Sequence, residues 1–317
     1  MRMTRRIFVG AAAAILGAAL WTGAAGAAEK KVAIVLPGSI TDQAFNQVLY
    51  EGIVLVKDEL KVEVAHSEKV KQADQSEHLE DYARRGYGLV FGAGGEFVES
   101  TKRAAQRYPD AMFACLNCAL IEGVATVNYD NHSIGYLLGY VAGKVSTTGK
   151  IGLISGQKIK PALDIIEGME KGLKAARGSG EVLVTYTNDW DDVAKAKEAA
   201  FGQISQGAEA IVPYLDNGIV GVMQGLKEKG KWGLGAITDL NASWPDTNLV
   251  SVVQNWRQAV LTFTKLYLDG KAERKNYVFG IGTEPLSLGT VNAKVPAAVK
   301  GDVDKLVADM KAGKFKM

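Results

Sequence analysis

The sequence predicts an α/β protein with two Rossmann-like lobes, each built on a parallel sheet, and a cleft between the lobes. Short apolar runs alternate with amphipathic stretches along the whole chain, as expected for βαβ units. About ten apolar runs occur, which is too many for one compact open sheet. The chain has 317 residues, and single hydrophobic cores stop growing at about 250–300 residues. Two lobes are therefore expected.

Composition and charge exclude several classes of protein. The chain is 47% hydrophobic and 23% charged, which excludes a disordered tail, a collagen-like rod and a disulfide-dense miniprotein. The first 27 residues contain three arginines and no acidic residue, so the rest carries 34 basic against 35 acidic residues. A nearly neutral chain lacks the basic surface that nucleic-acid partners require, so no nucleic-acid partner is expected.

The first 27 residues are predicted to be an export signal. Arg2, Arg5 and Arg6 precede an apolar stretch at residues 7–21, and Ala25-Gly26-Ala27 resembles a cleavage site. The stretch is shorter than the ~20 residues that a membrane-spanning helix needs. The adjacent arginines leave both the twin-arginine and the general secretory routes open. No cysteine lies near the cleavage site, so we expect a periplasmic protein without a lipid anchor.

The elements are expected in the following order. The apolar runs predict strands near residues 32–36, 61–65, 88–92, 111–116, 124–128, 150–155, 182–187, 208–213, 233–237 and 248–253. Helical periodicity predicts helices near residues 45–60, 75–86, 97–107, 131–146, 162–177, 192–206, 218–229 and 254–268. Thr41 or Asp42 is expected to cap the first helix, because a short side-chain oxygen accepts from free N–H groups of the first turn.

The lobes are expected to exchange segments. We assign residues 28–128 and about 254–285 to an N-terminal lobe, and residues 129–253 and about 286–317 to a C-terminal lobe. No Pro- or Ser-rich linker occurs between them. The sequence therefore predicts strand-like crossings between the lobes rather than a flexible tether.

Candidate ligand contacts follow the strands, because ligands of open α/β sheets bind beyond the carboxyl ends of the strands. The residues at these positions are rich in amides, acids, threonine and aromatic rings, and Glu96 and Asn117 are among them. Such groups suit a small, planar, polar ligand better than an anion. The candidate ligand-binding residues are Asp42, Phe45, Asn46, Asn128, Trp190, Tyr214, Asp216, Asn217, Thr238, Asp239 and Gln254.

Each candidate also has a purely structural interpretation. Phe45 is in register with the apolar face of its helix and Trp190 follows a strand, so both could be core residues. The aspartates at these positions could be helix caps, namely Asp42, Asp192, Asp216 and Asp239. Gln254 and Asn255 lie near a lobe crossing and could satisfy backbone groups there.

Motifs for catalysis, cofactors and metals are lacking in the sequence. There is no P-loop, G-x-S-x-G elbow or H-E-x-x-H motif, and His66, His78 and His132 are scattered. Residues 92–97 have phenylalanine in place of the third glycine of a dinucleotide fingerprint, which predicts a tight strand-to-helix turn. Cys115 and Cys118 end an apolar run instead of opening a helix, so a disulfide or two half-buried thiols is favoured over redox chemistry.

The ordered set of short motifs resembles the basic membrane protein family, also called the purine-nucleoside lipoprotein family. The resemblance covers nearly the whole mature chain, and its motifs correspond to D-x-[SG]-F-N, Y-P-D-x-x-F, G-x-Y-L-x-G (slightly shifted here) and W-x-D-x-x-K-A-K. They are found at residues 42–46, 108–113, 135–139 and 190–197. The resemblance implies the type I periplasmic binding protein fold and a solute-binding role in an ATP-driven (ABC) import system. It also implies a membrane permease as partner, with the protein itself monomeric.

The resemblance implies roles for individual residues. Phe45 corresponds to an aromatic ring that lies on the purine, Asn46 to its polar neighbour, and Trp190 to a second aromatic wall. Thr238 stands where the family has a ribose-binding carboxylate, unless Asp239 substitutes, and Gln254 stands where it has a lysine. Loss of both charged groups makes a free purine base, or another small flat polar molecule, as good a candidate as a nucleoside.

Two other functions stay open. A sensory binding protein that presents its liganded form to a membrane receptor would have the same sequence features. An exported α/β hydrolase would need a nucleophile or a metal set, and the sequence offers neither.

Overall fold

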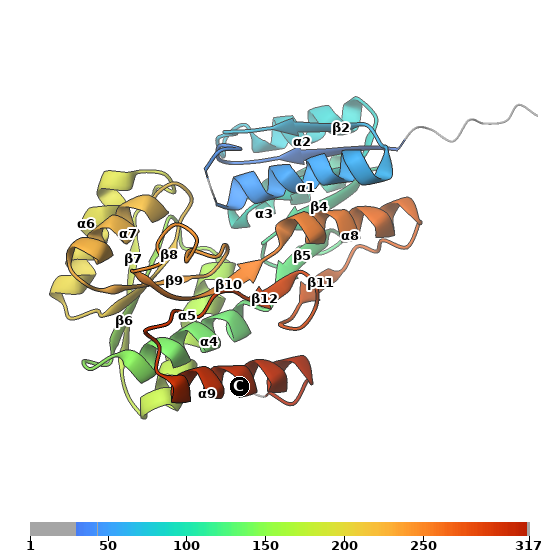
Figure 1. Cartoon of the computed structure of the whole chain (residues 1–317). Helices are drawn as coiled ribbons and strands as arrows, with labels where there is room; N and C mark the ends of the chain where they lie inside the picture. The colour runs from blue at the N-terminus through green and yellow to red at the C-terminus, as the bar shows by residue number, and fades with distance from the viewer. Residues whose placement is uncertain (1–29, 43, 316–317) are drawn as a thin grey trace, which may run out of the picture.

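The N-terminal lobe is one six-stranded sheet between two pairs of helices (Figure 1). The computed structural model describes residues 30–42 and 44–315. All strands of this sheet run parallel, in the order β11-β5-β4-β3-β1-β2. The strands are β1 (Lys31–Val35), β2 (Val64–Ser67), β3 (Tyr87–Ala93), β4 (Met112–Leu116), β5 (Ala125–Tyr129) and β11 (Asn276–Phe279).

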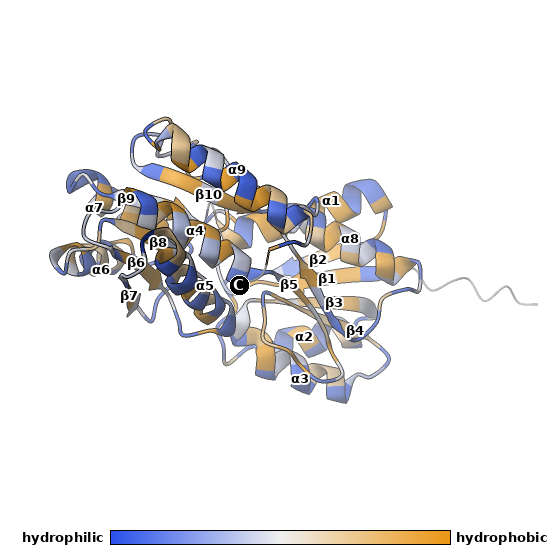
Figure 2. Ribbon diagram, turned by 90° about the horizontal axis from the view of Figure 1, so that it is seen from below, coloured by the Kyte–Doolittle hydropathy of each residue, from blue (hydrophilic) through white to orange (hydrophobic). Residues whose placement is uncertain are grey.

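The helices of this lobe cover both faces of the sheet. Helices α1 (Phe45–Leu60) and α8 (Trp256–Leu268) pack together, as do α2 (Gln75–Arg84) and α3 (Val98–Arg107). The central strands are consequently buried on both faces, and this explains why their sequences are almost continuously apolar. In Figure 2 these strands appear largely in hydrophobic orange.

The C-terminal lobe repeats the design, with one exception. Its sheet has the order β12-β10-β9-β8-β6-β7. The strands are β6 (Lys150–Ser155), β7 (Glu181–Tyr186), β8 (Ala210–Tyr214), β9 (Trp232–Gly235), β10 (Asn248–Gln254) and β12 (Leu286–Leu288). Strand β12 is antiparallel to β10, because the chain enters it directly from the other lobe, without the crossover helix that a parallel strand needs. The expected α/β fold of two mostly parallel sheets is confirmed.

The C-terminal lobe contains five of the described helices. They are α4 (Asn131–Val145), α5 (Lys160–Arg177), α6 (Val193–Ser205), α7 (Ile219–Glu228) and α9 (Ala297–Lys311). Helices α4 and α5 pack against each other, α6 against α7, and α9 against α4. The predicted elements correspond to β1–β10 and α1–α8, whereas β11, β12 and α9 were not predicted.

Glycines allow α4 and α5 to approach closely. A Cβ atom at Gly135 or Gly139 would clash with the backbone carbonyl of Ile165 or Met169 on α5. A Cβ atom at Gly168 would likewise clash with the backbone carbonyl of His132 on α4. The two backbones are therefore in direct contact, which only glycine permits.

Three short crossings connect the lobes. They lie at residues 129–131, 254–256 and 279–286. The Asp130 N–H donates to the Phe279 carbonyl over 3.0 Å, and the Asn255 N–H donates to the Pro285 carbonyl over 2.7 Å. The third crossing is thus hydrogen-bonded to both of the others, as expected for a structured hinge rather than a tether.

The predicted export signal, residues 1–27, lies outside the described residues. Within the described part of the chain, no helix combines the length and the apolar character that crossing a bilayer requires.

Candidate ligand-binding site

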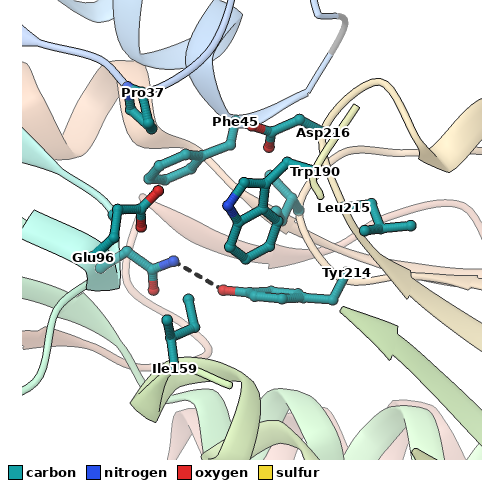
Figure 3. Close-up of a pocket in the computed structure, with 11 residues that line it drawn as sticks. Pro37, Phe45, Glu96, Ile159, Trp190, Tyr214, Leu215 and Asp216 are labelled. Atoms are coloured by element: carbon teal, nitrogen blue, oxygen red, sulfur yellow. Dashed lines mark hydrogen bonds between the residues drawn. The ribbon is translucent and has the colours of Figure 1, made fainter. Parts of the chain in front are cut away.

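A cavity lies between the two lobes at the carboxyl ends of their strands (Figure 3). Its free volume is about 20 Å³, room for about one water molecule, so a larger ligand can enter only when the lobes move apart. Both lobes contribute to its wall, which consists of Pro37, Phe45, Gly94, Glu96, Asn117, Ile159, Trp190, Tyr214, Leu215, Asp216 and Ile237. Four of the predicted candidates line this cavity, namely Phe45, Trp190, Tyr214 and Asp216.

The two aromatic candidates come from opposite lobes. Phe45 begins α1. Its ring packs edge to face with the ring of buried Trp256, and the two ring centroids are 5.5 Å apart. Trp190 precedes α6 and covers Gly156, where a side chain would clash with the indole. The Trp190 carbonyl accepts hydrogen bonds from the N–H groups of Asp216 and Gly218. Both rings are held by packing, and both also border the cavity, so packing does not remove either ring from its wall.

Two hydrogen bonds join the lobes beside the cavity. Asn46 Nδ2 donates to Asp216 Oδ2 over 2.6 Å, and Asn117 Nδ2 donates to the Tyr214 hydroxyl over 2.8 Å, the dashed line of Figure 3. All four side chains are buried. Because each bond needs one partner from each lobe, this is a closed arrangement of the lobes.

Asp42 organises the N-terminal side of this contact. Its carboxylate accepts from the backbone N–H groups of Ala44, Asn46 and Gln47 at 2.8–3.0 Å. It also accepts from Asn46 Nδ2 over 2.8 Å. Asp42 thus caps α1, and it fixes the amide that reaches Asp216.

Two buried polar atoms of the cavity wall have no hydrogen-bond partner within the described part of the chain. They are the indole nitrogen Nε1 of Trp190 and the amide oxygen Oδ1 of Asn117. Buried polar groups are normally paired, since an unpaired one costs about 1–3 kcal/mol. A bound ligand with complementary groups would satisfy these atoms.

Acidic groups dominate the electrostatics of the site. Burial, aided by the charges of Asp42 and Asp191, raises the pKa of Asp216 well above its usual value. Burial also raises the pKa of Glu96 to about 7. None of the described residues that line the cavity is Lys, Arg or His. The cavity therefore disfavours anions.

Thr238 and Asp239 line a second hollow, which borders the first. Asp42 and Asp216 also belong to its wall. The Asp239 carboxylate already accepts from the N–H and the hydroxyl of Thr290 at 2.9 and 2.7 Å, and from the Asn241 N–H at 3.1 Å. Partial burial opposes ionisation of Asp239, but these hydrogen bonds outweigh it and lower its pKa.

Three other candidates lie away from both hollows. Asn128 bonds within its own lobe, to the Cys118 N–H and to Asn276. Asn217 is exposed at the start of α7. Gln254 lies in the hinge, where its amide donates to the Ala236 carbonyl and accepts from the Trp256 indole at 2.8 and 2.9 Å.

The rule that pointed to post-strand residues omitted the apolar part of the wall. Glu96 and Asn117 are polar post-strand residues of the wall that the set of candidate ligand-binding residues does not include. The apolar residues Pro37, Ile159, Leu215 and Ile237 lie beyond the ends of strands as well. Their positions after strands therefore indicated all of these residues, but the selection favoured polar and aromatic side chains and so omitted the apolar ones.

Cys115 and Cys118 form a disulfide, with their Cα atoms 5.8 Å apart. It spans the end of β4 and encloses Asn117, whose φ of 59° lies in the left-handed region. The bond thus closes the turn that carries a cavity residue. The predicted tight turn after β3 is also present, with Gly94 at φ 103°.

One histidine has carboxylates nearby that sequence spacing did not indicate. His132 Nε2 on α4 lies 3.2 Å from Glu167 and 3.5 Å from Asp164, both on α5. Lys160 and Lys171 pair with these carboxylates. The cluster therefore already contains its own cations.

Comparison with known proteins identifies the family. The family model described as ABC transporter substrate-binding protein PnrA-like (Bmp) matches residues 29–309. A transcriptional activator protein of Bacillus subtilis is 28% identical over 280 residues, 88% of this chain and 87% of that protein. A purine-binding protein of Brucella abortus is 26% identical over 257 residues, 80% of this chain and 73% of that protein.

A solved structure supports the fold. A solute-binding protein of an ABC transporter system from Aeropyrum pernix superimposes with a TM-score of 0.80 at 20% identity, over 90% of this chain and 92% of that one. Since the family model covers most of the chain, this protein belongs to the Bmp family of PnrA-like substrate-binding proteins of ABC transporters.

Proposed function

We propose that this protein binds a purine base in the cavity between its lobes and delivers it to the permease of an ABC importer. The proposal rests mainly on the cavity. Its wall combines Phe45 and Trp190, from opposite lobes, with two unpaired polar atoms, Trp190 Nε1 and Asn117 Oδ1. The Phe45 ring suits the flat face of a purine, and the unpaired donor and acceptor atoms of Trp190 and Asn117 suit its edge. The purine-binding relative from Brucella abortus supports this ligand class.

A base fits the site better than a nucleoside. Both Gln254 amide atoms are engaged in the hinge, and Asp239 is occupied by its own loop. Thr238 offers only a neutral hydroxyl to a sugar. The remaining carboxyl groups, Glu96 and Asp216, line the cavity that we assign to the base, so ribose hydroxyls would find no free charged acceptor of their own.

We further propose that residues 1–27 direct export and that the mature protein works as a monomer in the periplasm. The support is the arginine-rich start, the apolar stretch and the small residues before Ala28. Fractionation of cells that produce the full chain, with mass spectrometry of the mature N-terminus, tests this proposal. Full-length protein in the cytoplasm would contradict it.

Two measurements test the ligand. Mass spectrometry of small molecules released from purified, denatured protein should detect a purine. Calorimetry should then show that adenine or guanine binds at least as tightly as its nucleoside. A nucleoside that binds more than about a hundredfold tighter, ~2.7 kcal/mol, would refute the preference for the base. If no purine binds, the ligand class is wrong.

A signalling role is the second candidate, because one relative is described as a transcriptional activator. Uptake of labelled purine by a deletion strain separates the two roles. Loss of uptake supports transport, whereas unchanged uptake with altered gene expression supports signalling.

A further inference from the structure

We propose that Glu96 and Trp190 read one edge of the ligand, with Glu96 accepting N–H groups and the Trp190 indole donating to a ring or carbonyl acceptor, so that guanine is preferred over adenine. This inference rests on the proposed purine-binding function and specifies which purine the same cavity selects.

Glu96 is placed in the cavity by the turn after β3. Gly94 adopts a φ of 103° and the short helix Gly95–Phe97 follows, so that the side chain turns inward toward the other lobe. Among the described residues, the Glu96 carboxyl group has a hydrogen bond only with its own backbone. Burial raises its pKa to about 7, because water is displaced and no cation replaces it.

Trp190 faces Glu96 across the cavity. Figure 3 shows the indole nitrogen directed toward the Glu96 carboxyl group, with Phe45 beside both. No hydrogen bond joins the two, and Trp190 Nε1 is buried without a partner. An acceptor and a donor therefore point into the same space, where a planar ligand would meet both.

The remaining polar groups of the cavity wall restrict the chemical class of the ligand further. Asn117 Oδ1 is a second unpaired acceptor, and Asp216 and Tyr214 are the other titratable groups that line the cavity. The lining is consequently rich in acceptors and lacks any cation among the described residues. It suits a ligand that donates several hydrogen bonds and carries no negative charge.

Guanine meets this arrangement and adenine does not. Guanine presents a ring N–H and an amino group side by side, so a carboxylate can accept two parallel bonds, and its O6 and N7 can accept from an indole N–H. Adenine places a ring lone pair beside its amino group, and that lone pair repels a carboxylate. An amide at this position, in contrast, would donate and accept, the pattern that pairs with adenine.

The test is the ratio of guanine to adenine affinity in Glu96→Gln. Calorimetry at pH 8, with the sparingly soluble base in the cell, compares the wild type, Glu96→Gln and the control Glu99→Gln. Glu99 is exposed on α3, so the control removes the same charge outside the cavity. We expect at least a tenfold preference for guanine in the wild type and in the control, and at least a tenfold smaller preference in Glu96→Gln.

A second variant tests the donor. Trp190→Phe keeps an aromatic ring and removes the N–H, so guanine binding should weaken about fivefold, the equivalent of one neutral hydrogen bond. An unchanged base preference in Glu96→Gln would overturn the inference and leave purine binding intact. Failure of the wild type to bind any purine would overturn both this inference and the proposed function.

Discussion

Glu209 offers a quantitative test of how the C-terminal lobe is stabilised. Its carboxylate, just before β8, accepts five hydrogen bonds from residues 146–148, the turn that connects α4 to β6. The distances lie between 2.6 and 3.0 Å. We consider Glu209→Gln, which keeps the size of the side chain and one acceptor oxygen but removes the charge.

The magnitude follows from the pKa of Glu209. Partial burial opposes ionisation, but hydrogen bonds from Ser146, Thr148 and Thr147 outweigh it and lower the pKa from 4.5 to about 2. At about 1.36 kcal/mol for each unit, the whole shift would correspond to about 3.4 kcal/mol. Solvent screens this half-buried group, so we expect Glu209→Gln to lower the free energy of unfolding at pH 7 by about 1–2 kcal/mol.

The contribution of Glu209 to the free energy of unfolding should decrease as the pH falls. The carboxylate is ionised in the folded and unfolded chain at pH 7, so the full contribution is present there. Below about pH 4.5 the unfolded chain binds the proton first, and the contribution is lost as the pH falls toward 2. The difference between wild type and Glu209→Gln should therefore be constant from pH 7 to pH 5 and shrink below that.

Urea unfolding followed by circular dichroism measures this difference at pH 7, 5, 4 and 3.5. Glu181→Gln is the matched control, because exposed Glu181 makes a single ion pair with Lys150 and should change stability by less than about 1 kcal/mol. A Glu209→Gln effect that equals that of the control, or that does not shrink below pH 5, would refute the reasoning.

Three further predictions concern the cleft and the helices behind it. Trp190→Ala should weaken ligand binding at least tenfold by calorimetry, since it removes both the apolar surface of the indole and its hydrogen-bond donor; unchanged affinity with an intact fold would make Trp190 a core residue only. Tyr214→Phe removes the hydroxyl to which Asn117 donates across the lobes. It should reduce ligand affinity about two- to tenfold and increase the radius of gyration of the ligand-free protein in small-angle scattering. An identical radius and affinity would rule out this hydrogen bond as a contact that closes the lobes. Gly168→Ala should lower the free energy of unfolding by about 1–3 kcal/mol, because its Cβ would clash with the backbone of α4, whereas Gly202→Ala, with open space around it, should be neutral or stabilising; equal effects of the two substitutions in urea unfolding would contradict close packing of the helices.

The central strands could be predicted because they are buried on both faces. Strands β1 and β8, for example, are almost entirely buried and almost entirely apolar, so their sequences carry a strong signal. Strands β11 and β12 have only four and three residues; β11 alternates between exposed and half-buried positions, and β12 has one buried residue. So short a segment at the edge of a sheet cannot be distinguished from a loop by periodicity.

Helix α9 did carry a signal. Val299, Val303 and Val307 recur at every fourth residue and are its buried residues. Most of its other residues are small or charged, and Leu306 and Met310 are only partly buried, so the fully buried stripe is narrow; blue and orange alternate along α9 in Figure 2. The stripe is narrow because α9 packs mainly on one neighbouring helix, α4.

The site was predictable as a region but not as a list of contacts. The rule that ligands bind beyond strand ends brought Phe45, Trp190 and Asp216 to one cavity. The same rule also selected Gln254, which belongs to the hinge. Both the cavity and the hinge lie at the ends of strands, and only the arrangement of the two lobes distinguishes them.

The exchange of segments between the lobes also affects how the chain folds. Strand β11 completes the first sheet and β12 the second, and both lie near the C-terminus, at residues 276–279 and 286–288. During synthesis, at about 5–20 residues per second, neither sheet can acquire its last strand until almost the entire chain has left the ribosome. A nascent chain that ends before residue 276 exposes β5 and β10 as unpaired sheet edges, which are sites for aggregation or chaperone binding.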